Sequence, residues 1–147
     1  MQVRLICAGT REFKNYNVLS TVLRDTCEEI EKKIKKTNPD ETVEFEIVSG
    51  KAAGPDTMGE TYAKNHKLAL AEFPAKWAEE GKYAGFKRNK RMADYANEAD
   101  KGVLVAFWDY NSRGTENMIK EARALDNIEV HIIDVSGSIN KEDKKKD

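Results

Sequence analysis

Apolar, β-branched runs alternate along this chain with segments in which apolar residues recur every three or four positions. The first pattern predicts buried strands, and the second predicts amphipathic helices. Strands are predicted at 3–8, 42–48, 67–73, 103–108 and 128–135, and helices at 17–36, 57–65, 87–99 and 115–125. Because strand and helix alternate throughout, we expect an α/β fold: a three-layer sandwich in which a mainly parallel sheet of about five strands carries helices on both faces.

Two segments leave their local structure open. KLALAEF at 67–73 is interpreted as a strand, but its Ala and Leu content makes a helix the competing interpretation. Residues 74–85 begin at a proline and contain two glycines, and we expect them to form a long loop. One domain is expected over residues 1–136, followed by a charged tail over 137–147 that is expected to be disordered.

Composition excludes several classes of protein from first consideration. The net charge of −1 over 147 residues makes a nucleic-acid partner unexpected, since such domains are usually basic. Cys7 and Cys27 lack a CxxC or Cys/His pattern and are interpreted as buried thiols in a reducing compartment. His66 and His131 are too isolated to suggest a metal site, and no cofactor is expected. No apolar stretch approaches the ~20 residues of a membrane span, so we expect a cytoplasmic protein without a membrane partner.

The glycines and polar residues of the predicted loops gather at one end of the predicted sheet. GTREF follows the first strand, SGKAAGPD the second, PAKWAEEGKYAG the third and DYNSRG the fourth. The loops at the opposite end are the short turns TNPDE, NH, EAD and DN. Ligands of open parallel sheets bind outside the carboxyl ends of the strands, near the point where strand order reverses. The asymmetry therefore predicts a ligand site at this edge.

The loop SGKAAGPD offers the backbone to an anion. Ser49 ends the strand, and Gly50 and Gly54 lack a Cβ, so a ligand can approach the main chain. The helix that follows presents N–H groups and the positive end of its dipole. The alternative is a plain glycine-rich turn in which Asp56 caps the helix.

A second helix start lies at the same edge, at Ser112, Arg113, Gly114 and Thr115. The arginine offers a planar fork for a phosphate, and the threonine hydroxyl can cap the helix or contact a phosphate. Ordinary capping is the alternative for this segment as well.

Further candidates lie in the other loops of this edge. Arg11 follows the first strand, and Lys82 belongs to the basic run GKYAGFKRNKRM. On a helix from about residue 87, Arg88 shares a face with Met92 and so is expected to point toward the sheet edge.

Two tryptophans and one carboxylate at the same edge have open roles. Trp77 and Trp108 could stack on a base, but packing is the commoner role. Asp109 could bind a ribose or assist a water molecule, or else close an Asx-turn.

Four motifs occur in order over about 3–135: GTREF, VSGKAAGPDTMGETYA, WAEEGKYAGFKRNKRM and VAFWDYNSRGTENM. Together they resemble the YspA-type branch of the SLOG superfamily, which groups with the DprA (Smf) and LOG proteins. The resemblance implies a Rossmann-like sheet, a nucleotide-type ligand and association into homo-oligomers. The residues that match the family's ligand loops are Gly9, Thr10, Arg11, Ser49, Gly50, Gly54, Asp56, Arg88, Asn89 and Ser112 to Thr115. Relatives of the LOG type that cleave nucleoside monophosphates carry a glutamate where this chain has Met118.

Three functions follow as hypotheses. The first is a binding module for a phosphorylated nucleotide-type ligand, such as an ADP-ribose-like or cyclic nucleotide signal, that acts as a sensor or a sequestering protein. The second is a nucleotide N-glycoside or phosphate-ester hydrolase in which Asp109 or Glu60 is the catalytic carboxylate. The third is single-stranded DNA binding, supported only by Trp77 and the basic run 82–91.

Overall fold

The structure, a computed structural model, describes residues 1–139 of the chain. Its centre is a five-stranded, all-parallel sheet with the order β3-β2-β1-β4-β5. The strands are β1 (Gln2–Gly9), β2 (Glu44–Ser49), β3 (Ala69–Glu72), β4 (Lys101–Trp108) and β5 (Ile128–Asp134). The helices are α1 (Tyr16–Thr37), α2 (Pro55–Asn65), α3 (Trp77–Glu80), α4 (Ala84–Asn97) and α5 (Arg113–Arg123). The expected α/β sandwich with a Rossmann-like sheet is thus confirmed.

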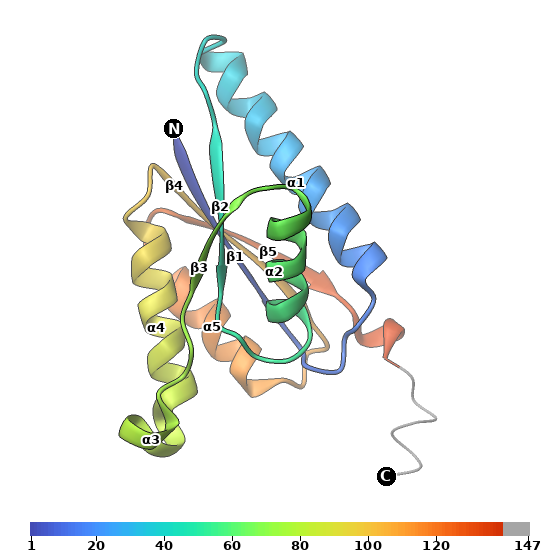
Figure 1. The fold of residues 1–147 in the computed structure, drawn as a ribbon, viewed down its shortest axis with the longest axis vertical. Helices are drawn as coiled ribbons and strands as arrows, with labels where there is room; N and C mark the ends of the chain where they lie inside the picture. Colours follow the sequence, from blue (N-terminus) through green and yellow to red (C-terminus); the bar gives the residue numbers. More distant parts are fainter. Residues whose placement is uncertain (140–147) are drawn as a thin grey trace.

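Two apolar cores separate the three layers. On one face, α1 and α2 cover the side chains of Leu5, Ile47 and Val105 (Figure 1). On the other face, α4 and α5 cover Ile6, Val48 and Leu104 (Figure 1). Successive strand residues point to opposite faces, so a strand buried on both sides is apolar at every position. This explains why VLVAF at 103–107 is fully buried, although the central strand of the sheet is β1 and not β4.

The strand order reverses at β1, and this reversal determines where the loops at the carboxyl edge of the sheet separate. The chain runs from β1 through β2 to β3 on one side, and then places β4 and β5 on the other side of β1. The loops after β1 and β4 therefore leave the same edge toward opposite faces, the arrangement that opens a crevice in doubly wound sheets.

The structure corrects several predicted boundaries. The segment 67–73 is a strand, but β3 covers only Ala69–Glu72. Residues 74–85 are not a continuous loop, because α3 and a 3₁₀ turn at Gly81–Tyr83 lie within them and α4 already begins at Ala84. The sequence pattern missed these because α3 has four residues, too few to show a helical period, and it has no buried residue.

The prediction that Asp56 caps α2 is wrong. The N-cap is Gly54, whose φ of 84° and ψ of −129° are open to glycine, and Pro55 occupies the first helical position. Asp56 is therefore the second residue of the helix. Its carboxylate points back toward the loop, where the amide of Ala52 donates to its Oδ2 over 3.4 Å.

The end of the described chain packs against the domain. Ser136–Ser138 form a 3₁₀ turn and Ile139 is buried. The remainder of the expected tail, residues 140–147, lies outside the described residues. Among residues 1–139, no helix has both the length and the apolar composition that crossing a membrane requires.

Gly54→Ala is expected to lower the free energy of unfolding by about 2 kcal/mol. The backbone conformation at this position is strained for any residue with a Cβ, and an added Cβ would lie 2.7 Å from the carbonyl oxygen of Arg11. Urea denaturation measures the effect. Gly114→Ala is the matched control, since nothing lies within 4 Å of a Cβ there. Equal stability of the two variants would contradict the prediction.

Candidate ligand-binding site

A small pocket opens at the reversal point of the sheet, between the loops after β1, β2 and β4. We call it the inner pocket; its volume is about 70 Å³. Its lining includes Arg11, Asp56, Arg88, Asn89, Ser112, Gly114 and Thr115, with Ala8, Met92 and Met118 as apolar members. Segments separated by about a hundred residues thus meet in one hollow, as the loop asymmetry predicted.

A wider, more open hollow adjoins the inner pocket. This outer pocket has a volume of about 300 Å³ and is lined by Arg11, Gly50, Lys51, Ala52, Ala53, Pro74, Ala75, Trp77 and Arg88. Both arginines and Ala52 belong to the two linings, so the two pockets lie side by side. Trp77, from α3, stands at the rim with 55% of its surface exposed. The outer pocket alone reaches the lower end of the usual size range of small-molecule sites.

Arg88 is the most firmly held cation of the site. It comes from the second turn of α4, where the periodicity turns it inward beside Met92, and only 9% of its surface is exposed. Its Nη1 donates to the carbonyl oxygen of Gly50, and its Nε donates to Oδ1 of Asn89 over 3.0 Å. A guanidinium has five N–H donors. Within residues 1–139 these two bonds leave Nη2 to a ligand.

Asn89 connects Arg88 to the start of α5. Its Nδ2 donates to the carbonyl oxygen of Gly114 over 3.2 Å and to Oδ1 of Asn117 over 2.9 Å. At that start, Ser112 is the N-cap, and its Oγ accepts from the amide of Thr115 over 3.3 Å. The amide of Thr115 is therefore capped, whereas the amides of Arg113 and Gly114 have no acceptor within the helix and are the ones that could bind an anion there.

Asp56 places a carboxylate in the same pocket as the two arginines. It is 4% exposed, and its burial raises the pKa of the carboxyl to about 6, against the charge of Arg88, which lowers it. Burial in turn lowers the pKa of Arg88, while Asp56 raises it and Arg11 lowers it further. An arginine stays charged in proteins all the same, so two cations and one anion face the hollow.

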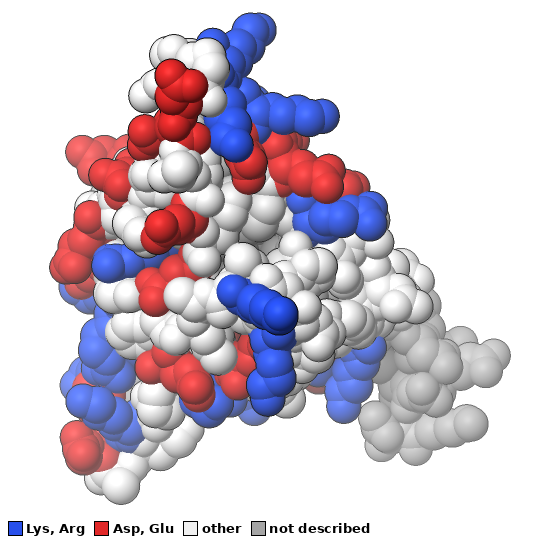
Figure 2. All heavy atoms as spheres, turned by 45° about the horizontal axis from the view of Figure 1, so that its top comes forward, with Lys and Arg blue, Asp and Glu red and all other residues white. Residues whose placement is uncertain are grey.

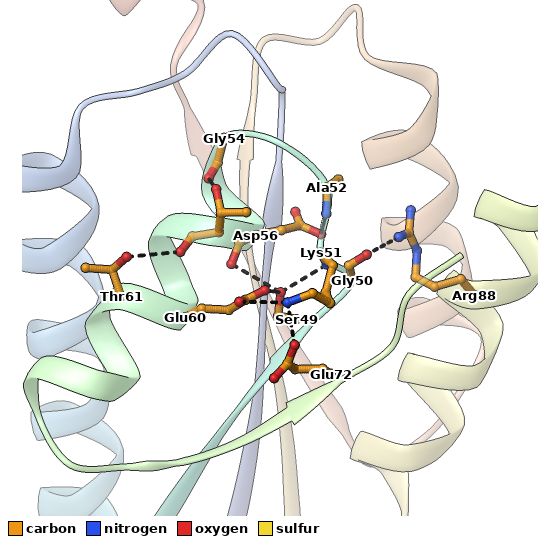
Figure 3. Close-up of polar contacts among 11 residues, drawn as sticks. Ser49, Gly50, Lys51, Ala52, Gly54, Asp56, Glu60, Thr61, Glu72 and Arg88 are labelled. Atoms are coloured by element: carbon orange, nitrogen blue, oxygen red, sulfur yellow. Dashed lines mark hydrogen bonds and ion pairs between the residues drawn. The ribbon is translucent and has the colours of Figure 1, made fainter. Parts of the chain in front are cut away.

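The loop after β2 is held by a polar network behind the pockets. Ser49 Oγ donates to Oε2 of Glu60 over 2.6 Å and accepts from the amide of Lys51 over 3.0 Å (Figure 3). The ammonium of Lys51 donates to Oε1 of Glu60 over 3.0 Å and also to Glu72 (Figure 3). These bonds raise the pKa of Lys51, most of all the one to Glu72. Lys51 thus binds two carboxylates, and these ion pairs hold the loop after β2 in place.

Several predicted binding residues lie outside the inner lining. Thr10 is buried, and its Oγ1 accepts from the amide of Asp109 over 3.1 Å, which ties the loops after β1 and β4 together. Gly54 packs against the backbone of Arg11. Lys82 and Arg113 are exposed and line neither pocket. Gly9 lines the inner pocket, whereas Gly50 lines only the outer one.

The two carboxylates expected for hydrolysis also lie outside both linings. Oδ1 of Asp109 accepts from the amides of Asn111 over 2.8 Å and Ser112 over 2.9 Å, which is the Asx-turn alternative. Glu60 is engaged by Ser49 and Lys51. Met118 lines the inner pocket.

The sequence patterns did not predict that Lys51 holds the loop after β2 in place, or that Pro74 and Ala75 line the outer pocket. The partner of Lys51 at Glu72 depends on the parallel register in which Ser49 lies opposite Glu72. No local pattern in the sequence predicts the register between β2 and β3. Met92, by contrast, was predicted to point inward from its helical period, and it is 1% exposed.

The surface gives little support to a nucleic-acid or metal site. Acidic and basic side chains are interspersed over the face shown in Figure 2, with no extended basic area. Many of the cations are paired: Arg91 with Glu80, for instance, and Lys90 with Asp94. Among the described residues, no three His, Cys, Asp or Glu side chains lie together as a metal site would need.

Comparison with known proteins adds no evidence on function, so the function is argued from the geometry of the two pockets. No family model, no curated protein and no solved structure matches the chain.

Proposed function

We propose that this chain binds a phosphorylated, nucleotide-type ligand at the carboxyl edge of its sheet. The observation that carries the proposal is the convergence of Arg11, Arg88 and the first turn of α5 on one small pocket. Guanidinium groups and helix N-terminal amides are the usual ligands of phosphate in proteins.

The outer pocket accommodates the rest of such a ligand. It lies beside the inner pocket at Arg11 and Arg88 and extends to the exposed face of Trp77. A base or ribose there would remain attached to a phosphate in the inner pocket, because the two volumes share both arginines. Membership of the SLOG superfamily and association into homo-oligomers stay predictions beside this proposal.

Hydrolysis is the weaker candidate function. Neither Asp109 nor Glu60 lines a pocket, and both accept hydrogen bonds that give them structural roles. Near-neutral net charge continues to weigh against DNA binding. A sensor or a sequestering protein requires only the binding step.

A thermal-shift panel tests the proposal. Adenosine and guanosine 5′-monophosphates, their cyclic 3′,5′-monophosphates and ADP-ribose are each added to the protein, with the unphosphorylated nucleosides as matched controls. A ligand at 100 times its Kd is expected to stabilise the fold by about 2.7 kcal/mol, which corresponds to a rise in Tm of roughly 5–10 °C. The nucleosides are expected to give a far smaller rise. No rise with any phosphorylated compound, or an equal rise with the nucleosides, would contradict the proposal.

A further inference from the structure

A buried carboxylate lies in the inner pocket beside the two arginines, and its negative charge affects which anions can bind there. Asp56 lines the inner pocket with 4% of its surface exposed. Its Oδ2 accepts from the amide of Ala52 over 3.4 Å, and its backbone carbonyl oxygen lies 3.2 Å from Ser49 Oγ, whose proton is engaged by Glu60. The bond from Ala52 and the burial of the residue hold the carboxylate in the pocket.

The charge of Asp56 is not cancelled by a direct ion pair. Within residues 1–139, no Lys or Arg nitrogen lies within 4.0 Å of its oxygens. Arg88 directs Nη1 to the carbonyl of Gly50 instead. The charged or titratable groups around the carboxylate are Arg88 from α4, Arg11 from the loop after β1 and the thiol of Cys7 from β1. Two positive charges and one negative charge leave a sum of +1 for a ligand.

We propose that Asp56 selects the charge of the bound phosphate, so that the pocket prefers a singly charged phosphodiester to the doubly charged phosphomonoester of the same nucleoside. This inference rests on the proposed function. The first negative charge of a ligand balances the pocket. A second one remains unbalanced, and it is repelled by the buried carboxylate that lines the same pocket.

The test compares ligands that differ by one methyl group and one charge. The 5′-monophosphates of adenosine, guanosine, cytidine and uridine are each paired with their 5′-methyl esters, and Kd is measured by calorimetry at pH 7.5. A phosphomonoester is then mostly a dianion, because its second pKa is about 6, whereas the methyl ester carries a single charge. For the nucleoside that binds best, the wild-type protein is expected to bind the ester about tenfold more tightly.

Removal of the Asp56 charge should abolish this preference. Asp56→Asn is expected to shift the ratio of the two Kd values at least tenfold toward the monophosphate, chiefly by tighter binding of the monophosphate. Asp56→Ser is a second neutral variant, expected to give the same shift if the asparagine variant folds poorly. Asp25→Asn removes an exposed carboxylate from α1 and controls for overall charge; its ratio should equal that of the wild type.

The possible outcomes separate the two proposals. Binding of the monophosphate with a ratio that neither neutral variant changes would overturn charge selection and leave the proposed function standing. Binding of none of the eight compounds by the wild-type protein would overturn charge selection; the proposed function is then decided by the thermal-shift panel, whose cyclic nucleotides and ADP-ribose are not among the eight.

Discussion

Replacement of Arg88 by glutamine is expected to weaken the binding of a phosphorylated nucleotide by at least about 100-fold. Arg88 is 9% exposed and is oriented by Asn89, so it presents its remaining donors to the inner pocket without a search for the right rotamer. Hydrogen bonds to charged groups contribute about 1.5–3 kcal/mol each, and a 100-fold change in Kd corresponds to about 2.7 kcal/mol. Calorimetry with the tightest ligand of the thermal-shift panel measures the loss.

Two further variants test whether the loss of affinity is specific to the guanidinium of Arg88. Arg88→Lys keeps the charge but not the planar fork that reaches both Gly50 and Asn89, so only part of the affinity should return. Arg123→Gln, at the exposed end of α5, removes an arginine far from both linings and should bind as the wild type does. A folded Arg88→Gln protein with an affinity within threefold of the wild type would exclude Arg88 as a phosphate ligand.

Asp56→Asn is expected to raise the free energy of unfolding near neutral pH by about 2–3 kcal/mol. In the folded protein, burial raises the pKa of this carboxyl from 3.8 to about 6. Between these two values the folded state binds more protons than the unfolded state, so stability falls as the pH rises. The cost is complete above about pH 6, and at 1.36 kcal/mol per pKa unit the shift amounts to about 3 kcal/mol. Asparagine resembles the protonated carboxyl and avoids this cost.

The signature of this effect is its pH dependence. Urea denaturation at intervals from pH 4 to pH 7.5 should show little difference between Asp56→Asn and the wild type at pH 4, and the full difference by pH 7. Because other carboxylates titrate in both proteins, only the difference between the two curves reports on Asp56. Asp25→Asn, measured over the same range, controls for the loss of one exposed carboxylate. A constant difference for Asp56→Asn would exclude the buried, ionised carboxylate.

The stability cost and the proposed selectivity have one physical origin. A carboxylate that is expensive to bury is retained in the pocket of this fold, and strained or costly groups tend to concentrate at functional sites. In the described structure the Oδ2 of Asp56 accepts from the amide of Ala52, and this bond anchors the loop after β2. Asparagine could make a similar bond, so this bond does not explain why a charged residue is present. The proposed selection of the ligand's charge would explain it.

Local patterns in the sequence were sufficient for the layers of the fold. The uninterrupted apolar run over 103–108 and the apolar period of three to four over 17–36 each indicate the burial of a single element, and these elements are present as β4 and α1. The position of the site followed as well, because the carboxyl ends of parallel strands share one edge whatever their order. The inward turn of Arg88 needed only the helical period that it shares with Met92.

Contacts between distant segments decided the rest. Whether a given loop residue lines the pocket or fastens the loop depends on neighbours that the sequence separates by tens of residues: Thr10 bonds to Asp109, and Lys51 reaches Glu72 through the register of β2 and β3. The role of Asp56 changed for the same reason, since Gly54 and Pro55 open the helix and turn its carboxylate toward the arginines. Periodicity reports which face of an element is buried, whereas hydrogen-bond partners and charge balance exist only once the elements are packed together.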